Sequence, residues 1–153
     1  MSKNLERGVE VYTVMRAIVK QIEGLSLVGK SDSNHWVPLD SAKSFGGSEA
    51  GVRPMEMVLI ALGGCTSMDV LSILKKMREN VLDYDVSLEA ERSEGHPAVF
   101  TKIHLHYMIA GKGINSDNVN KAIDLSMNKY CSVSAMLKKS VDMSWDFEIK
   151  EAD

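Results

Sequence analysis

Two cysteines, Cys65 and Cys131, are the residues of this chain whose type and spacing could do chemistry. The sequence of 153 residues has no other thiol, and both cysteines stand in sequence typical of helices. If the fold brings them close, the pair can form one disulfide and thereby take up and release two electrons. Buried cysteine also serves as a small apolar side chain. A redox role and an inert packing role are therefore both open.

Other chemical motifs are weaker. His104 and His106 share one face of an expected strand, a spacing found in metal sites, but no third ligand follows at motif spacing. The chain has no CxxC pair, no glycine-rich phosphate loop and no Ser-His-Asp arrangement. We interpret the histidines as a solvated strand face, and we expect neither a metal nor a cofactor.

Net charge, the N-terminal sequence and the length of the apolar run limit the partners and the cellular compartment that we expect. A net charge of −3, with 25% charged residues, provides no cationic surface for nucleic acid or anionic lipid. The first eight residues lack the features of a signal peptide, so the thiols are expected in a reducing compartment, the cytoplasm. Around Pro54–Leu74 the longest apolar run, 57–62, is far shorter than the roughly 20 residues of a membrane span. We expect a core helix and no membrane partner.

The pattern of apolar residues predicts a single α+β domain over residues 1–153. It consists of an N-terminal β-region at 9–39, in which a first strand covers 9–22, a central helix at 54–78, strands at 82–92 and 99–110, a helix at 116–130 and a C-terminal strand at 141–149. Period-two alternation in the later strands indicates antiparallel sheets with one solvated face. In the strand at 99–110 the residues expected to face inward are Val99, Thr101, Ile103, Leu105, Tyr107 and Ile109, with Phe100 facing out.

Two further expectations concern the residues that cap the helices and the burial of the central helix. Asn115 or Ser116 is expected to cap the second helix, and Ser132 or Ser134 a short turn that follows it. The central helix is apolar almost all round in its first half, so it needs more cover than one small sheet supplies. A second copy of the chain, approaching at Gly63 and Gly64, would complete that cover. We therefore expect an intimate homodimer.

Two blocks of sequence resemble the OsmC/Ohr family, which includes the organic hydroperoxide resistance proteins. The first runs from Gly46-Gly47 through Pro54-Met-Glu-Met-Val-Leu-Ile-Ala-Leu-Gly-Gly-Cys65-Thr-Ser-Met-Asp69-Val, and the second is Tyr130-Cys131-Ser-Val-Ser134. The order of strands and helices agrees over nearly the whole chain. The resemblance implies an α+β fold with antiparallel sheets around a long buried central helix, built as an intertwined homodimer. It also implies a thiol-dependent peroxidase acting on organic hydroperoxides.

Carried over by motif, the family's roles fall on residues of both blocks. Cys65 would attack the peroxide, Cys131 would resolve the product, and an external dithiol would reopen the disulfide. Glu56 stands one residue after the family's glutamate position, which turns a helical side chain by about 100°. Arg16 is the first positional candidate for the catalytic arginine, and Arg53 is the second.

Other readings of the same residues stay open. Glu56 could be an ordinary acid in the first helical turn, and Arg16 could lie on the solvent face of a strand. Asp69, one turn after Cys65, could contact the site or be a surface group. The alternative function is a non-catalytic dimer of this fold that binds a small apolar ligand at the dimer cleft.

Overall fold

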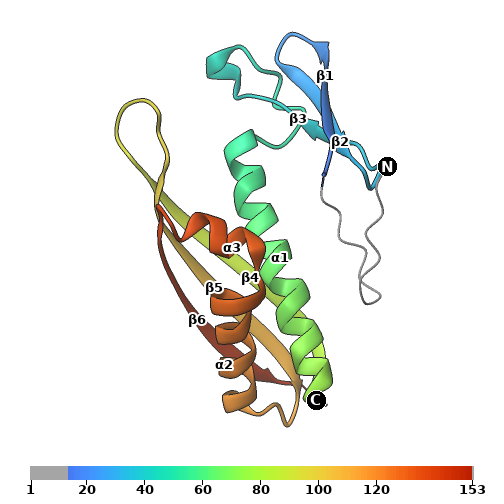
Figure 1. The fold of residues 1–153 in the computed structure, drawn as a ribbon, viewed down its shortest axis with the longest axis vertical. Helices are drawn as coiled ribbons and strands as arrows, with labels where there is room; N and C mark the ends of the chain where they lie inside the picture. The colour runs from blue at the N-terminus through green and yellow to red at the C-terminus, as the bar shows by residue number, and fades with distance from the viewer. Residues whose placement is uncertain (1–13, 153) are drawn as a thin grey trace. The chain divides into compact units, whose positions relative to one another are not determined.

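The computed structural model describes residues 14–152 of the chain, so the first part of the strand expected at 9–22 lies outside the described residues. The structure divides into two compact units, Met1–Met57 and Val58–Asp153. The expected single domain over residues 1–153 stays a prediction. Both units contain a β-sheet, and helices occur mainly in the second (Figure 1). The α+β class is confirmed.

The N-terminal unit is a three-stranded antiparallel sheet. Its strands, in spatial order, are β1 (Ala17–Glu23), β2 (Ser26–Ser31) and β3 (Val37–Leu39). A turn at Gly24, whose φ of 55° lies in the left-handed region that favours glycine, joins β1 to β2. Pro38 lies in β3, at the edge of the sheet, where a residue without a backbone N–H is tolerated. Every residue of β1 is exposed, so this sheet has little core of its own.

The loop after β3 is organised by Asp40, which is only 3% exposed. Its carboxylate accepts hydrogen bonds from the backbone N–H of Ser41 (2.7 Å), Ser48 (3.2 Å) and Ala50 (3.0 Å) and from Ser26 Oγ (2.8 Å). These donors lower the pKa of Asp40 to about 2, and the backbone N–H of Ser41 contributes most. The loop, which includes the short helix η1 (Lys43–Phe45), is thus held by one carboxylate.

Helix α1 (Pro54–Lys76) begins at the predicted proline and ends two residues before the predicted Arg78, which has a positive φ of 62°. Its buried residues are Leu62, Gly63, Thr66, Val70 and Leu74, which recur at helical spacing. Ile60 and Met68 are exposed, so the expected long buried helix is buried on one face only. By length and composition α1 could cross a membrane, a test that core helices of soluble proteins also pass. The buried face of α1 packs in the core of the second unit, Val58–Asp153.

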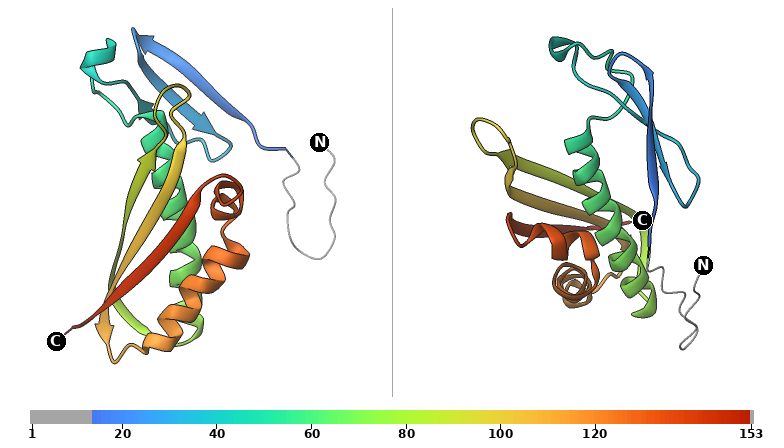
Figure 2. Two further views of the ribbon diagram at one scale, coloured as in Figure 1. Left: turned by 90° about the vertical axis from the view of Figure 1, so that its left-hand side faces the viewer. Right: turned by 45° about the horizontal axis from the view of Figure 1, so that its top comes forward.

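The second unit contains a sheet of three long strands with helices on one face (Figures 1 and 2). Its strands, in spatial order, are β4 (Asn80–Arg92), β5 (Phe100–Lys112) and β6 (Asp142–Glu151). β4 and β5 pair antiparallel, but β5 and β6 pair parallel. The prediction of purely antiparallel sheets is therefore wrong for β6. The helical crossover between β5 and β6 returns the chain to the starting end of the sheet, which makes a parallel pair possible.

The core side of β5 is mostly as predicted. Ile103, Leu105, Tyr107 and Ile109 alternate and are at most 1% exposed. At the start of the strand the prediction is wrong, because Val99 and Thr101 are exposed and Phe100 is buried. A register irregularity between Glu91 and Arg92, opposite Phe100, breaks the period of two there.

The strand histidines contact β6. His104 Nδ1 lies 2.8 Å from Ser144 Oγ, and His106 Nδ1 lies 2.5 Å from Asp146 Oδ1. His106 and His104 lower the pKa of Asp146, and the hydrogen bond from His106 is the larger cause. This cluster is a polar ladder across two strands.

The helical crossover has three parts where one helix at 116–130 and a short turn were expected. Helix α2 (Ser116–Leu125) continues into one turn of π-helix, η2 (Ser126–Tyr130), and α3 (Ser132–Leu137) follows. Asn115 caps α2 as predicted, accepting hydrogen bonds from the backbone N–H of Asp117 and Asn118. The expected serine cap of α3 is wrong, because Cys131 occupies the N-cap and its Sγ accepts from the backbone N–H of Ser134 at 3.3 Å.

Candidate thiol site

The two cysteines meet inside the second unit. Cys65 lies in the middle of α1, and Cys131 lies at the junction of η2 and α3. The two Sγ atoms and a carboxylate oxygen of Asp69 all lie within 4.8 Å of one another. Both thiols are free. A disulfide needs an S–S distance of about 2.05 Å, so the two sulfurs must approach each other before the bond can form.

The π-turn positions Cys131. Its backbone N–H donates to the carbonyl of Ser126, five residues earlier, at 2.9 Å. Compared with an α-helix, this turn holds one extra residue, which rotates the end of α2 and lets the chain restart as α3. Isolated π-turns are frequent at functional sites. Here the turn directs the Cys131 thiol toward α1.

The two thiols differ in exposure. Cys131 is 2% exposed, whereas Cys65 is half-buried. The pKa of Cys131 is raised to about 11, mainly by burial and then by a hydrogen bond with Cys65, while the backbone N–H of Ser134 acts in the opposite direction. Cys131 is therefore a protonated thiol at neutral pH, and Cys65 is the more accessible sulfur.

Three hydroxyl groups form a hydrogen-bonded chain that ends at the Asp69 carboxylate. Tyr107 Oη lies 2.7 Å from Thr66 Oγ1, which lies 2.9 Å from Ser126 Oγ. Ser126 Oγ is also 3.1 Å from Asp69 Oδ2, and because an ionised carboxylate only accepts, the serine donates to it. Burial raises the pKa of Tyr107. Since Thr66, Ser126 and Tyr107 are all fully buried, they fix the position of Asp69 beside the thiols.

The cationic candidates belong to the other unit, as does Glu56. Arg16 is exposed, and its backbone N–H donates to Asp32 Oδ2 at 3.2 Å. Glu56 accepts from the backbone N–H of Arg53 at 2.9 Å and pairs with its guanidinium at 3.4 Å. Glu56 thus satisfies an N–H at the start of α1, which is half of a capping box. Among residues 58–152, no lysine or arginine donates a hydrogen bond to either sulfur.

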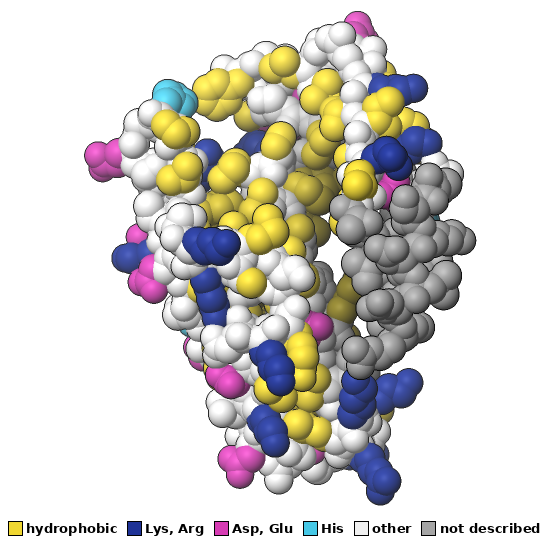
Figure 3. All heavy atoms as spheres, in the orientation of Figure 1, with side chains coloured by type: hydrophobic (Ala, Val, Ile, Leu, Met, Phe, Trp, Pro, Cys, Tyr) yellow, Lys and Arg dark blue, Asp and Glu magenta, His cyan; other side chains and the backbone are white. Residues whose placement is uncertain are grey.

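A cavity of about 450 Å³ adjoins the thiol site. It shares Asp69 with the site, and its lining comes mainly from α1, the end of α2 and η2. On the face drawn in Figure 3, hydrophobic side chains reach the surface among Lys and Arg side chains. The cavity's lining residues are Asp69, Ser72, Ile73, Lys76, Met77, Leu125 and Tyr130. The site therefore has a mainly apolar recess beside it.

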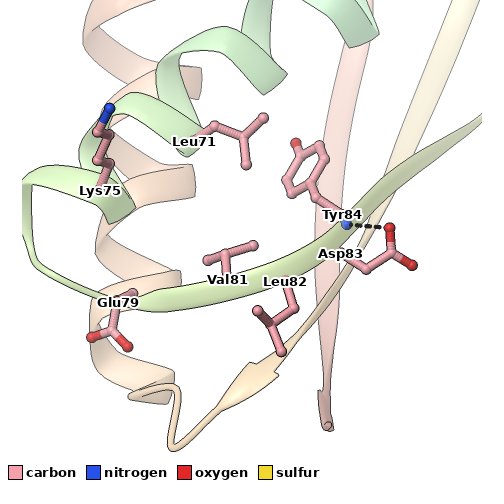
Figure 4. A pocket seen from close by; sticks show the side chains of 7 residues that line it. All are labelled: Leu71, Lys75, Glu79, Val81, Leu82, Asp83 and Tyr84. Atoms are coloured by element: carbon pink, nitrogen blue, oxygen red, sulfur yellow. Dashed lines mark hydrogen bonds between the residues drawn. The ribbon is translucent and has the colours of Figure 1, made fainter.

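A second cavity, of about 410 Å³, has no cysteine in its lining (Figure 4). It lies between Leu71 and Lys75 of α1 and the first residues of β4. Beside Leu71, the Tyr84 hydroxyl is buried and has no hydrogen-bond partner among the described residues. Ser67 Oγ, a nearby hydroxyl, instead donates to the Gly63 carbonyl at 2.6 Å. Burial raises the pKa of Tyr84 to about 12.

Sequence reasoning found the cysteines but not their buried neighbours. Asp69 was left open, and Thr66, Ser126 and Tyr107 were not considered for the site. The i, i+4 spacing of Cys65 and Asp69, which places both on one helix face, was the available signal. The contacts with Ser126 and Tyr107 depend on tertiary packing, for which the sequence has no motif.

Residues 46–146 match the family model described as OsmC-like protein, and the chain belongs to the OsmC/Ohr family. Protein YhfA of Escherichia coli strain K12 is 43% identical over 138 residues, covering 90% of this chain and 100% of that protein. A hypothetical protein from Aquifex aeolicus VF5, whose crystal structure is solved, is 29% identical, with a TM-score of 0.80 over 92% of this chain and 98% of its own.

A crystal structure from Legionella pneumophila, described as an organic hydroperoxide resistance protein OsmC, has a TM-score of 0.68. It is 13% identical and covers 91% of this chain and 99% of its own. At that identity the similarity shows the fold alone.

Proposed function

We propose that this protein is a cysteine-based peroxidase that reduces organic hydroperoxides in the cytoplasm, with Cys65 as the attacking thiolate and Cys131 as the resolving thiol. One observation carries the proposal: sulfurs 66 positions apart in the sequence lie within 4.8 Å of each other. Such proximity is what a thiol pair needs in order to cycle between two thiols and one disulfide.

The reaction has two steps on the protein. The Cys65 thiolate attacks one peroxide oxygen, the O–O bond breaks, and the alkoxide leaves as an alcohol after taking a proton. This gives a sulfenic acid on Cys65. Cys131 then attacks the Cys65 sulfur, the S–O bond breaks, and water leaves while the disulfide forms. An external dithiol reduces the disulfide by exchange and returns both thiols.

The environments of the two sulfurs support this assignment. Cys65 is the more exposed, so a substrate reaches it first. Because its pKa is about 11, Cys131 remains a thiol while Cys65 reacts, and it does not compete for the peroxide. A guanidinium would raise the thiolate fraction of Cys65 and stabilise the leaving alkoxide. Arg53, which Glu56 already orients, and Arg16 are the candidates.

The cavity beside Asp69 supports a preference for organic peroxides over hydrogen peroxide. Ile73, Met77 and Leu125 provide apolar surface for an alkyl chain, which hydrogen peroxide lacks. One buried methylene contributes about 0.8 kcal/mol, so a few of them give a clear preference.

A homodimer belongs to the same proposal. Ile60 (57% exposed), Met68 (76%) and Leu71 (39%) lie on a face of α1 that the described residues do not cover. A Cβ built on Gly64, between them, meets no atom within 4 Å. An apolar helix face with a glycine at its centre suits close packing against the same face of a second copy.

The test is steady-state consumption of an alkyl hydroperoxide and of hydrogen peroxide with a dithiol. Cys65→Ser is expected to abolish turnover. Cys131→Ser should leave one round of oxidation, with a sulfenic acid that a dimedone reagent traps. Ser132→Ala, an exposed neighbour of Cys131, is the matched control and should turn over normally. Wild-type consumption no faster than that of Cys65→Ser would overturn the peroxidase.

The second candidate is a non-catalytic protein that binds a small apolar ligand, which the same 450 Å³ cavity favours. It predicts binding of a fluorescent fatty-acid analogue that Leu125→Trp blocks, with no peroxide consumption. Binding accompanied by Cys65-dependent turnover would instead identify the cavity as the substrate pocket.

A further inference from the structure

We propose that the reduced chain binds one zinc ion through Cys65, Cys131 and Asp69. The proposal uses the two sulfurs of the proposed peroxidase together with Asp69, but it does not rest on peroxide chemistry. A chain that consumed no peroxide would still bind the metal. The sequence predicts no metal, because Cys131 lies 62 positions beyond Asp69 and no zinc motif has that spacing.

The donor set fits zinc. Two thiolates and one carboxylate are ordinary Zn²⁺ ligands, at about 2.3 Å for sulfur and 2.0–2.2 Å for oxygen. In a tetrahedral site, ligand atoms at these distances lie roughly 3.3–3.8 Å from one another. The three donor atoms already lie within 4.8 Å, so movements of about 1 Å bring them into place. Calcium and magnesium prefer sites made of oxygen, and soft sulfur ligands disfavour them.

The surroundings of Asp69 supply the second observation. Metal-binding carboxylates are usually held by a further hydrogen bond that fixes their orientation. Asp69 Oδ2 has this bond from Ser126 Oγ, which the buried hydroxyls of Thr66 and Tyr107 hold in turn. The carboxylate keeps a lone pair free for a metal while its direction is fixed.

The charges of the three side chains also favour a bound cation. Two thiolates and a carboxylate within 4.8 Å would repel one another, and a divalent cation relieves that repulsion. Among residues 58–152, no lysine or arginine donates a hydrogen bond to either sulfur. Lys138 Nζ instead donates hydrogen bonds to Met127 O (2.7 Å) and to Asn128 Oδ1 (2.5 Å).

An open position completes the site. Three protein ligands leave a fourth position of the zinc tetrahedron to water or to a small molecule. The cavity of about 450 Å³ includes Asp69, one of the three ligands, in its lining. Zinc and peroxide would therefore compete for the same sulfurs, and the metal would protect both thiols from oxidation.

The first experiment uses zinc and the whole reduced chain, without peroxide. Zn²⁺ is titrated in anaerobic buffer against a chromogenic zinc chelator. We expect one ion per chain, with binding lost in Cys65→Ser and in Cys131→Ser and weakened at least tenfold in Asp69→Asn. Cys131→Ser keeps an N-cap oxygen for α3, so it should remain folded. Asp124→Asn, which changes an exposed acid on α2, is the matched control and should bind like the wild type.

A second measurement does not depend on any variant. Cobalt(II) added to the reduced chain should give thiolate charge-transfer absorption and the intense visible bands of a tetrahedral site. Diamide, which takes up the two electrons and two protons of the thiols as the disulfide forms, should abolish both bands. His106→Asn tests the polar ladder on β5 and β6 and should leave the stoichiometry at one. Absence of cobalt–thiolate absorption, or zinc binding that persists in Cys131→Ser, overturns the site.

Discussion

The two faces of α1 differ in what covers them. One face carries Leu62, Val70 and Leu74, which are fully buried against the rest of the second unit. The other carries Ile60 and Met68, which are 57% and 76% exposed. Both faces are apolar, so apolar content alone does not distinguish a helix face that the chain covers from one that it leaves open. The covered face also bears Thr66, which links the helix to the thiol site.

The two neighbouring glycines show the same contrast at atomic scale. A Cβ on Gly63 would lie 3.0 Å from Leu88 Cδ1, whereas a Cβ on Gly64 meets nothing within 4 Å. Gly63 lets α1 approach β4 inside one chain. No described residue gives Gly64 such a reason, which supports the proposal that another copy packs there.

The largest effect is expected on the covered face. Leu74→Ala should lower the free energy of unfolding by about 2–5 kcal/mol, because it leaves a cavity in the core. Lys75→Ala, at the next and exposed position, should change it by no more than about 0.5 kcal/mol. Urea unfolding followed by circular dichroism measures both. Equal effects of the two substitutions would contradict the assignment of the faces.

On the open face, Met68→Glu should weaken the proposed dimer without unfolding the chain. Placing a carboxylate in an apolar interface is expected to raise the dimer dissociation constant at least tenfold, which corresponds to about 1.4 kcal/mol. Sedimentation or light scattering over a range of concentrations measures it. A wild type that remains a folded monomer at high concentration would refute the dimer itself.

The glycine pair should give a smaller effect. Gly63→Ala gains about 1 kcal/mol of helix propensity but forces Leu88 to move, at a cost of about 1–3 kcal/mol, so we expect it to be less stable than Gly64→Ala. A Cβ at Gly64 meets no atom of residues 14–152 within 4 Å, and alanine gains helix propensity, so the single chain should tolerate Gly64→Ala. Thermal unfolding of each variant, with the association state recorded, separates the two. A costly Gly64→Ala in a monomeric sample would show that the chain itself covers this face.

The last effect is confined to low pH and comes from Asp40, which lies outside both faces. Because its pKa falls from 3.8 to about 2 in the folded chain, its contribution to stability is present above about pH 4 and is lost as the pH falls toward 2. Asp40→Asn should remove this dependence and speed hydrogen exchange at the Ser48 and Ala50 amides. Unchanged exchange at both amides would show that the carboxylate does not hold the loop.

Much of the fold was predictable from the sequence. Pro54 indicated where α1 begins, alternation indicated the inward residues from Ile103 to Ile109, and Asn115 was found as a cap. These features depend on local propensity and periodicity. The parallel pairing of β6, the π-turn before Cys131 and the burial of Phe100 depend on tertiary packing, and local sequence did not indicate them.

The two cysteines of the site could be predicted from the sequence, but the residues around them could not. Cys65 and Cys131 followed from their motifs. Asp69 depends for its role on Ser126, which comes from a helix 57 positions away. Glu56 contacts Arg53, as an acid of the first helical turn would, and its part in catalysis remains a proposal together with those of Arg16 and Arg53.

The most direct test of the account is the mass of the intact, metal-free chain after one equivalent of an alkyl hydroperoxide. We predict the loss of two hydrogens and, after digestion, one peptide pair joined through Cys65 and Cys131. A chain that gains oxygen on Cys65 without forming this bond, or that does not react, would contradict the redox pair.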